Sequence, residues 1–91
     1  MTINSAISYL IDYAENHGMI SPLDRAYSTN ALLDLFGESE YEYDGSLSGE
    51  SLATVLDYLC TEAYAKGLIE SDTVVYRDLF DTRIMGLLCP R

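Results

Sequence analysis

Two glycines, Gly18 and Gly67, stand 49 residues apart, and each closes a stretch with the apolar spacing of an α-helix. Each is followed by two apolar residues and then by polar residues that can begin another helix. A shift of 49 residues also aligns identical residues, namely Tyr9 with Tyr58, Leu10 with Leu59, Ala14 with Ala63, Ile20 with Ile69, and Tyr27 with Tyr76. The sequence therefore predicts an all-α fold, a small bundle of four to five helices in which two helix–Gly–helix hairpins could pack pseudo-symmetrically.

The first and third helices have the clearest patterns. We expect the first from about Thr2 to His17, with an apolar arc of roughly 100° formed by Ile3, Ile7, Leu10, Ile11 and Ala14. The third should begin at Ser48 or Glu50 and end at Lys66-Gly67. Its apolar face includes Cys60, which is then a buried thiol that packs as a small hydrophobe.

The second helix has conflicting signals. Ser21 is a good N-cap, Pro22 suits the first helical position, and Asp24 completes an arrangement that resembles a capping box. Two apolar faces then point in nearly opposite directions, one with Leu23 and Tyr27 and the other with Leu32, Leu35 and Phe36. Either this helix is buried on two sides, or it restarts with Asn30 as the cap of a short helix that ends at Gly37.

Residues 37–50 lose all apolar periodicity and are rich in glutamate, serine, glycine and tyrosine. This composition predicts an acidic flexible loop within a single domain that spans residues 1–91. An acidic loop with tyrosines could imitate a nucleic-acid backbone, but a solvated connection is the more common role of such a charge run.

The last predicted helix places Tyr76, Leu79, Phe80, Ile84 and Leu87 on one face, with Arg83 among them. A guanidinium there must reach solvent or find an anionic partner. An intramolecular ion pair, or a surface arginine whose guanidinium reaches solvent, is the simpler interpretation. The alternative makes Arg83 a weak candidate for substrate binding, facing a catalytic domain. Arg77 and Asp81 form an ordinary i,i+4 pair.

The same final stretch carries a family resemblance. Asp-Leu-Phe-Asp-Thr-Arg-Ile-Met-Gly-Leu-Leu-x-Pro-Arg at residues 78–91, residues 1–18, and Asp24-Arg25-x-Tyr27-x-x-Asn30-x-Leu32-Leu33 resemble the N-terminal region of the Firmicute-type (class II) galactose-1-phosphate uridylyltransferases. The resemblance spans nearly the whole chain but matches only the front of a much longer enzyme, so we expect the polypeptide to continue past Arg91.

The resemblance implies a cytoplasmic enzyme that transfers UMP from UDP-glucose to galactose-1-phosphate in galactose metabolism, through a uridylylated histidine and without a cofactor. The nucleophilic histidine belongs to a motif downstream of this chain, and His17 does not match it. We therefore assign no catalytic residue here and expect the isolated chain to be inactive. The partner would be the catalytic domain of the same polypeptide. We expect the last helix to form the interface with it and to be under-buried in this chain, so that self-association through the last helix could occur in the absence of the catalytic domain.

Composition restricts the other functions. Five basic residues against fifteen acidic ones give a net charge of −10, which argues against nucleic acid or an anionic membrane as a partner. Two cysteines and one histidine, at their observed spacings, provide no metal site. No phosphate-binding glycine loop or catalytic triad pattern occurs. A stand-alone acidic helical interaction module, or a decoy that mimics nucleic acid, remains as an alternative.

Overall fold

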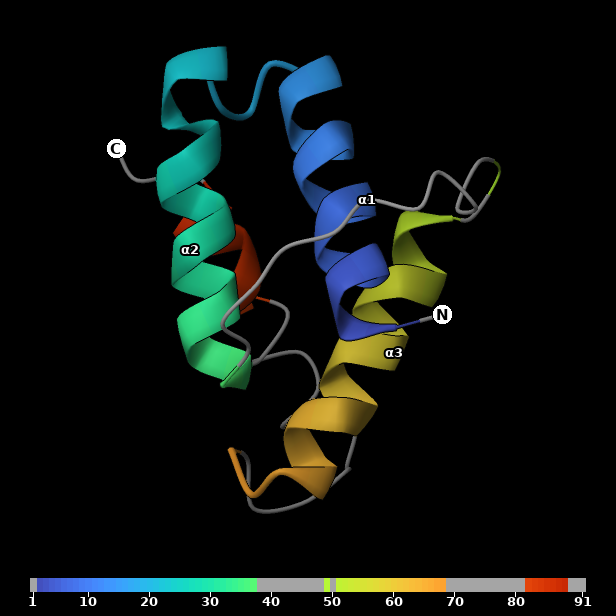
Figure 1. Cartoon of the computed structure of the whole chain (residues 1–91). Coiled ribbons are helices and arrows are strands. Elements are labelled where there is room, and N and C mark those ends of the chain that lie inside the picture. Colours follow the sequence, from blue (N-terminus) through green and yellow to red (C-terminus); the bar gives the residue numbers. More distant parts are fainter. Residues whose placement is uncertain (1, 38–48, 50, 69–81, 89–91) are drawn as a thin grey trace.

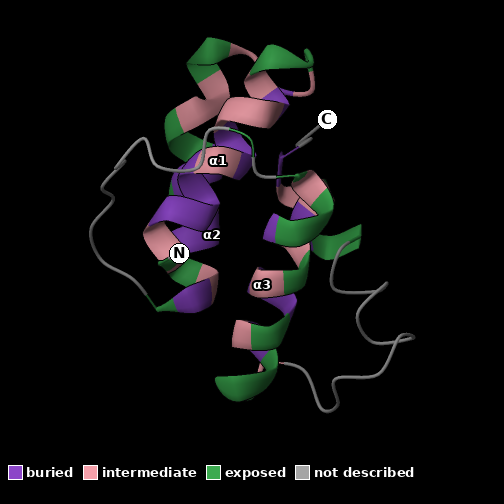
Figure 2. Ribbon diagram, turned by 90° about the vertical axis from the view of Figure 1, so that its right-hand side faces the viewer, coloured by how far each residue is buried: buried purple, intermediate pink, exposed green. Residues whose placement is uncertain are grey.

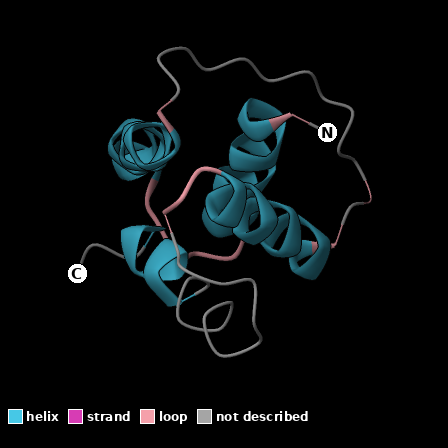
Figure 3. Ribbon diagram, turned by 90° about the horizontal axis from the view of Figure 1, so that it is seen from below, coloured by secondary structure: helices cyan, strands magenta, loops and turns pink. Residues whose placement is uncertain are grey.

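The computed structural model describes residues 2–37, 49, 51–68 and 82–88 of the 91-residue chain. Within these ranges the regular structure is entirely helical, as predicted: α1 (Ile3–Asn16), a 3₁₀ turn η1 (Pro22–Asp24), α2 (Arg25–Phe36) and α3 (Leu52–Ala65), together with a helical segment at 82–88. Figure 3 shows these helices from below, without a strand among the described residues. None of these helices combines the length and apolar character needed to cross a membrane.

α1 forms where the sequence predicts it, because both of its ends are capped. The Thr2 hydroxyl accepts a hydrogen bond from the Ser5 N–H at 3.0 Å. At the other end Gly18 adopts φ +70°. Its N–H donates to the Glu15 carbonyl, and the Met19 N–H donates to the Ala14 carbonyl at 2.8 Å. This is a Schellman motif, which only a residue that tolerates the left-handed region closes without strain.

α3 repeats these ends 49 residues later. The Ser51 hydroxyl accepts from the Thr54 N–H at 3.1 Å, and Gly67 adopts φ +76° beside a Leu68 N–H to Ala63 carbonyl bond of 2.8 Å. The N-cap is therefore Ser51 rather than Ser48 or Glu50, since Ser51 reaches the free N–H three residues on. The pseudo-symmetric packing of two complete hairpins stays a prediction, because residues 69–81 lie outside the described part.

α2 differs from both predicted alternatives. It runs without interruption from Arg25 to Phe36, so Asn30 is a mid-helix residue and not a cap. The helix is buried on one side only: Leu32 and Phe36 are in the core, whereas Leu23 is 93% and Tyr27 63% exposed. The predicted capping-box arrangement of Ser21 and Asp24 does not form. Ser21 makes no side-chain cap to the backbone, because its hydroxyl donates to the Asp24 carboxylate at 3.1 Å.

α1 is the central helix, and it packs against α2 on one side and α3 on the other (Figure 1). Figure 2 shows that buried residues are concentrated on α1, while exposed and buried residues alternate along α3. The core is one cluster with fully buried members in every helical segment, among them Ile7, Leu10, Leu32, Leu59 and Ile84. Cys60 is also fully buried, as predicted.

The helical segment at 82–88 lies behind α2 in the view of Figure 1. Ile84 and Leu88 are fully buried in the common core, with Leu87 half-buried against it. The expectation that this face is under-buried is therefore wrong for its described residues, because the i,i+4 pair of Ile84 and Leu88 packs into the same core as α1 and α3. Residues 76–81 of the predicted helix, including the Arg77–Asp81 pair, lie outside the described residues, as do residues 38–48 and 50 of the loop predicted at 37–50.

Candidate functional site

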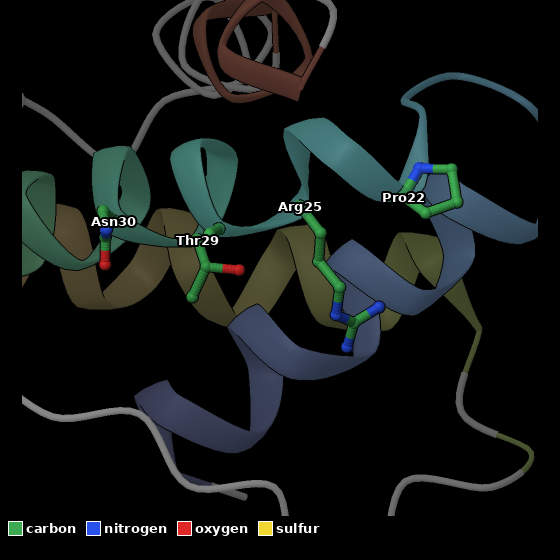
Figure 4. A pocket seen from close by; sticks show the side chains of 5 residues that line it. Pro22, Arg25, Thr29 and Asn30 are labelled. Carbon is green, nitrogen blue, oxygen red and sulfur yellow. The ribbon is translucent and has the colours of Figure 1, made fainter.

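The most concentrated charge in the described part of the chain lies where α2 begins. The Arg25 guanidinium reaches across to the C-terminal half of α1, as Figure 4 shows. Its Nη2 lies 2.6 Å from Asp12 Oδ1, and its Nη1 lies 3.3 Å from Glu15 Oε2. All three side chains are about one-third exposed. Each pair therefore contributes no more than about 1 kcal/mol, but together they fix where α2 starts relative to α1.

A groove of about 400 Å³ lies beside this bridge, lined by Pro22, Arg25, Ala26, Thr29 and Asn30 (Figure 4). Its lining is mostly apolar, and its one charged side chain, Arg25, is engaged by two carboxylates. A groove of this kind can receive an apolar or hydrogen-bonding group. It offers neither a nucleophile nor a general base, so we assign it no chemistry.

Sequence reasoning missed the Arg25 bridge, although a signal was present. A short link between two helices makes them antiparallel neighbours, and it places the first residues of the second helix beside the last turns of the first. Asp12 and Glu15 are three residues apart and thus neighbours on the α1 surface. An arginine at the start of α2 was therefore within reach of both.

Arg83, the candidate for substrate binding, is exposed on the segment at 82–88, next to the buried Ile84. Among the described residues no carboxylate pairs with it, since both ion pairs found there belong to Arg25. Arg83 is thus exposed beside buried apolar neighbours, as a surface arginine that reaches solvent would be.

His17 has a structural role at the end of α1. Its Nδ1 lies 2.9 Å from the Tyr13 carbonyl oxygen, and its ring stacks on the Tyr13 ring with centroids 3.9 Å apart. A carbonyl oxygen can only accept, so this pairing requires a proton on Nδ1. In the described part of the chain, no three His, Cys, Asp or Glu side chains are grouped as metal ligands would be. Cys89 lies outside that part.

The fold and the site together define the chain as a small all-α helical bundle whose described residues assemble no catalytic constellation. No family model matches it, and no solved structure matches it significantly. The chain is nevertheless similar over nearly its whole length to curated galactose-1-phosphate uridylyltransferases. It is 42% identical to the protein of Butyrivibrio fibrisolvens over 90 residues, which cover 98% of this chain and 23% of that protein.

Two further relatives carry the same name. The chain is 48% identical over 88 residues to the protein of Caldanaerobacter subterraneus and 32% identical over 93 residues to that of Bacillus subtilis. These matches cover 93% and 99% of this chain, but only 17% and 18% of the relatives. The chain belongs to the galactose-1-phosphate uridylyltransferase family as a segment that corresponds to the N-terminal part of its members. It spans about a fifth of the length of the curated relatives it matches.

These matches confirm the family predicted from residues 1–18, 24–33 and 78–91. They do not support the alternative of a self-standing acidic interaction module or a nucleic-acid decoy.

Proposed function

We propose that this chain is the N-terminal helical domain, residues 1–91, of an enzyme that transfers UMP from UDP-glucose to galactose-1-phosphate. The observation that carries the proposal is sequence identity of 42–48% over 93–98% of the chain with proteins of that name. The enzyme would act in the cytoplasm. The geometry agrees with a supporting role, because the charged groups best placed for ligand contact, those around Arg25, bind one another instead.

In this proposal the uridylylated histidine lies in the part of the polypeptide outside this chain, and His17 serves only to end α1. Arg83 is the one residue here that we retain as a candidate for contact with a substrate phosphate, since its guanidinium is exposed. Such a group forms two parallel hydrogen bonds with a phosphate when the geometry allows it.

The test is an assay of the whole polypeptide that carries this chain, supplied with UDP-glucose and galactose-1-phosphate. We expect UDP-galactose to form, and we expect His17→Ala to retain at least half of the wild-type turnover. The isolated chain should form none above background. A whole polypeptide that releases no UDP-galactose would contradict the proposal, as would turnover that disappears in His17→Ala while the variant remains folded.

A further inference from the structure

The outward side of η1 and of the first half of α2 carries apolar residues where a surface helix usually carries charge. We define the outer face of α2 as Pro22, Leu23, Ala26, Tyr27 and Asn30, all of which are exposed. At 100° per residue these side chains span one arc of roughly 140°, opposite the buried Ser28 and Leu32, and the exposed Asp34 lies in the same arc one turn beyond Asn30. None of the five is charged, and four are apolar, in a chain with twenty charged residues.

Single exposed apolar residues are normal, but a contiguous set is typical of an interaction surface. Leu23 is 93% exposed and Tyr27 is 63% exposed, so neither contributes much to the core of this chain. The groove described above continues the same face, because Pro22, Ala26 and Asn30 belong to both. Tyrosine is also one of the residue types enriched among those that dominate binding energy at interfaces.

We propose that the outer face of α2 docks onto the part of the uridylyltransferase polypeptide that lies outside this chain. The proposal rests on the proposed function, because it needs the longer polypeptide. About four-fifths of the length of the matched relatives lies outside the matched region. A polypeptide of that length provides a surface large enough to pack against the outer face of α2. The prediction from sequence placed this interface on the last helix, but Ile84 and Leu88 are buried there.

The net charge decides against a second copy as the occupant. Each copy carries −10, so a symmetric dimer would bring two strongly acidic surfaces together around an uncharged patch. For the remainder of the polypeptide, a covalent connection raises the effective concentration at the face. The outer face of α2 therefore positions this domain within the enzyme.

The test places a photo-reactive benzoylphenylalanine at position 27 of the whole polypeptide, irradiates it and maps the cross-links by mass spectrometry. A matched control carries the same group at position 64, an exposed tyrosine of α3 that is 48% exposed. We expect position 27 to cross-link within the same polypeptide to residues beyond Arg91, at a yield at least fivefold above that of position 64. Cross-links to a second copy or to residues 69–81, or a yield equal to the control, would overturn the proposal.

A second measurement uses the Leu23→Ala/Tyr27→Ala variant and the Tyr64→Ala control. The double variant should shorten the half-life of the whole polypeptide under limited proteolysis by at least threefold, while leaving that of the isolated chain unchanged. An equal loss in both would mean that these side chains stabilise this domain itself, and docking would be excluded. Neither measurement depends on turnover, so an inactive polypeptide that cross-links as expected would contradict only the proposed function.

Discussion

At the scale of single residues, two buried or capping hydroxyls should respond in opposite ways to removal. Ser28 is fully buried and its Oγ has no hydrogen-bond partner among the described residues, so Ser28→Ala removes an unsatisfied polar group. We expect the free energy of unfolding to stay within about 0.5 kcal/mol of wild type or to rise by up to about 1 kcal/mol. Ser51→Ala loses the N-cap of α3 and should cost about 1 kcal/mol. Urea titrations of both variants measure these changes in the free energy of unfolding. A loss above about 1 kcal/mol for Ser28→Ala would contradict the prediction and indicate a hydrogen-bond partner for the Ser28 hydroxyl.

At the scale of elements, the segment at 82–88 is part of this domain's own core. Ile84→Ala removes a fully buried side chain and should cost about 2–4 kcal/mol in the isolated chain. Arg83→Ala, one residue away and exposed, should change stability by less than about 0.5 kcal/mol. Similar small losses for both variants in urea titrations would support the prediction that this segment is an uncovered interface.

The elements also show what the sequence could and could not predict. α1 and α3 were predictable because one apolar face and the caps at both ends agree with each other. α2 was not, because its apolar residues lie on both sides of the helix. The sequence pattern does not distinguish an apolar residue that packs in the core from one on an exposed face. The structure does, because it shows that Leu23 and Tyr27 are exposed. The Arg25 bridge was missed because pairing between helices depends on their relative placement.

At the scale of the whole molecule, charge repulsion should control stability at low salt. The net charge is −10, and the longest dimension of the molecule is 34 Å. The Debye length is about 30 Å at 0.01 M salt, so repulsion acts across the entire molecule there, and it is about 10 Å at 0.1 M. Salt screening weakens the two ion pairs of Arg25 by at most about 1 kcal/mol each. We expect the same screening to remove a larger destabilising free energy, namely the mutual repulsion of the ten excess negative charges. Tm should therefore rise with sodium chloride between these concentrations, and a falling Tm would contradict this balance.

The repeated ends of α1 and α3 have a consequence for the order in which the chain acquires structure. Every capping hydrogen bond described for these helices joins groups three to five residues apart. Closing such short loops takes tens of nanoseconds and needs no distant part of the chain. Nucleation is the costly step in helix formation, and in α1 and α3 the capping hydrogen bonds at both ends are formed by residues of the helix itself or next to it. Each helix can therefore nucleate independently, and because helices of this length are marginally stable alone, the packing of α1 against α3 in the joint core is what stabilises them.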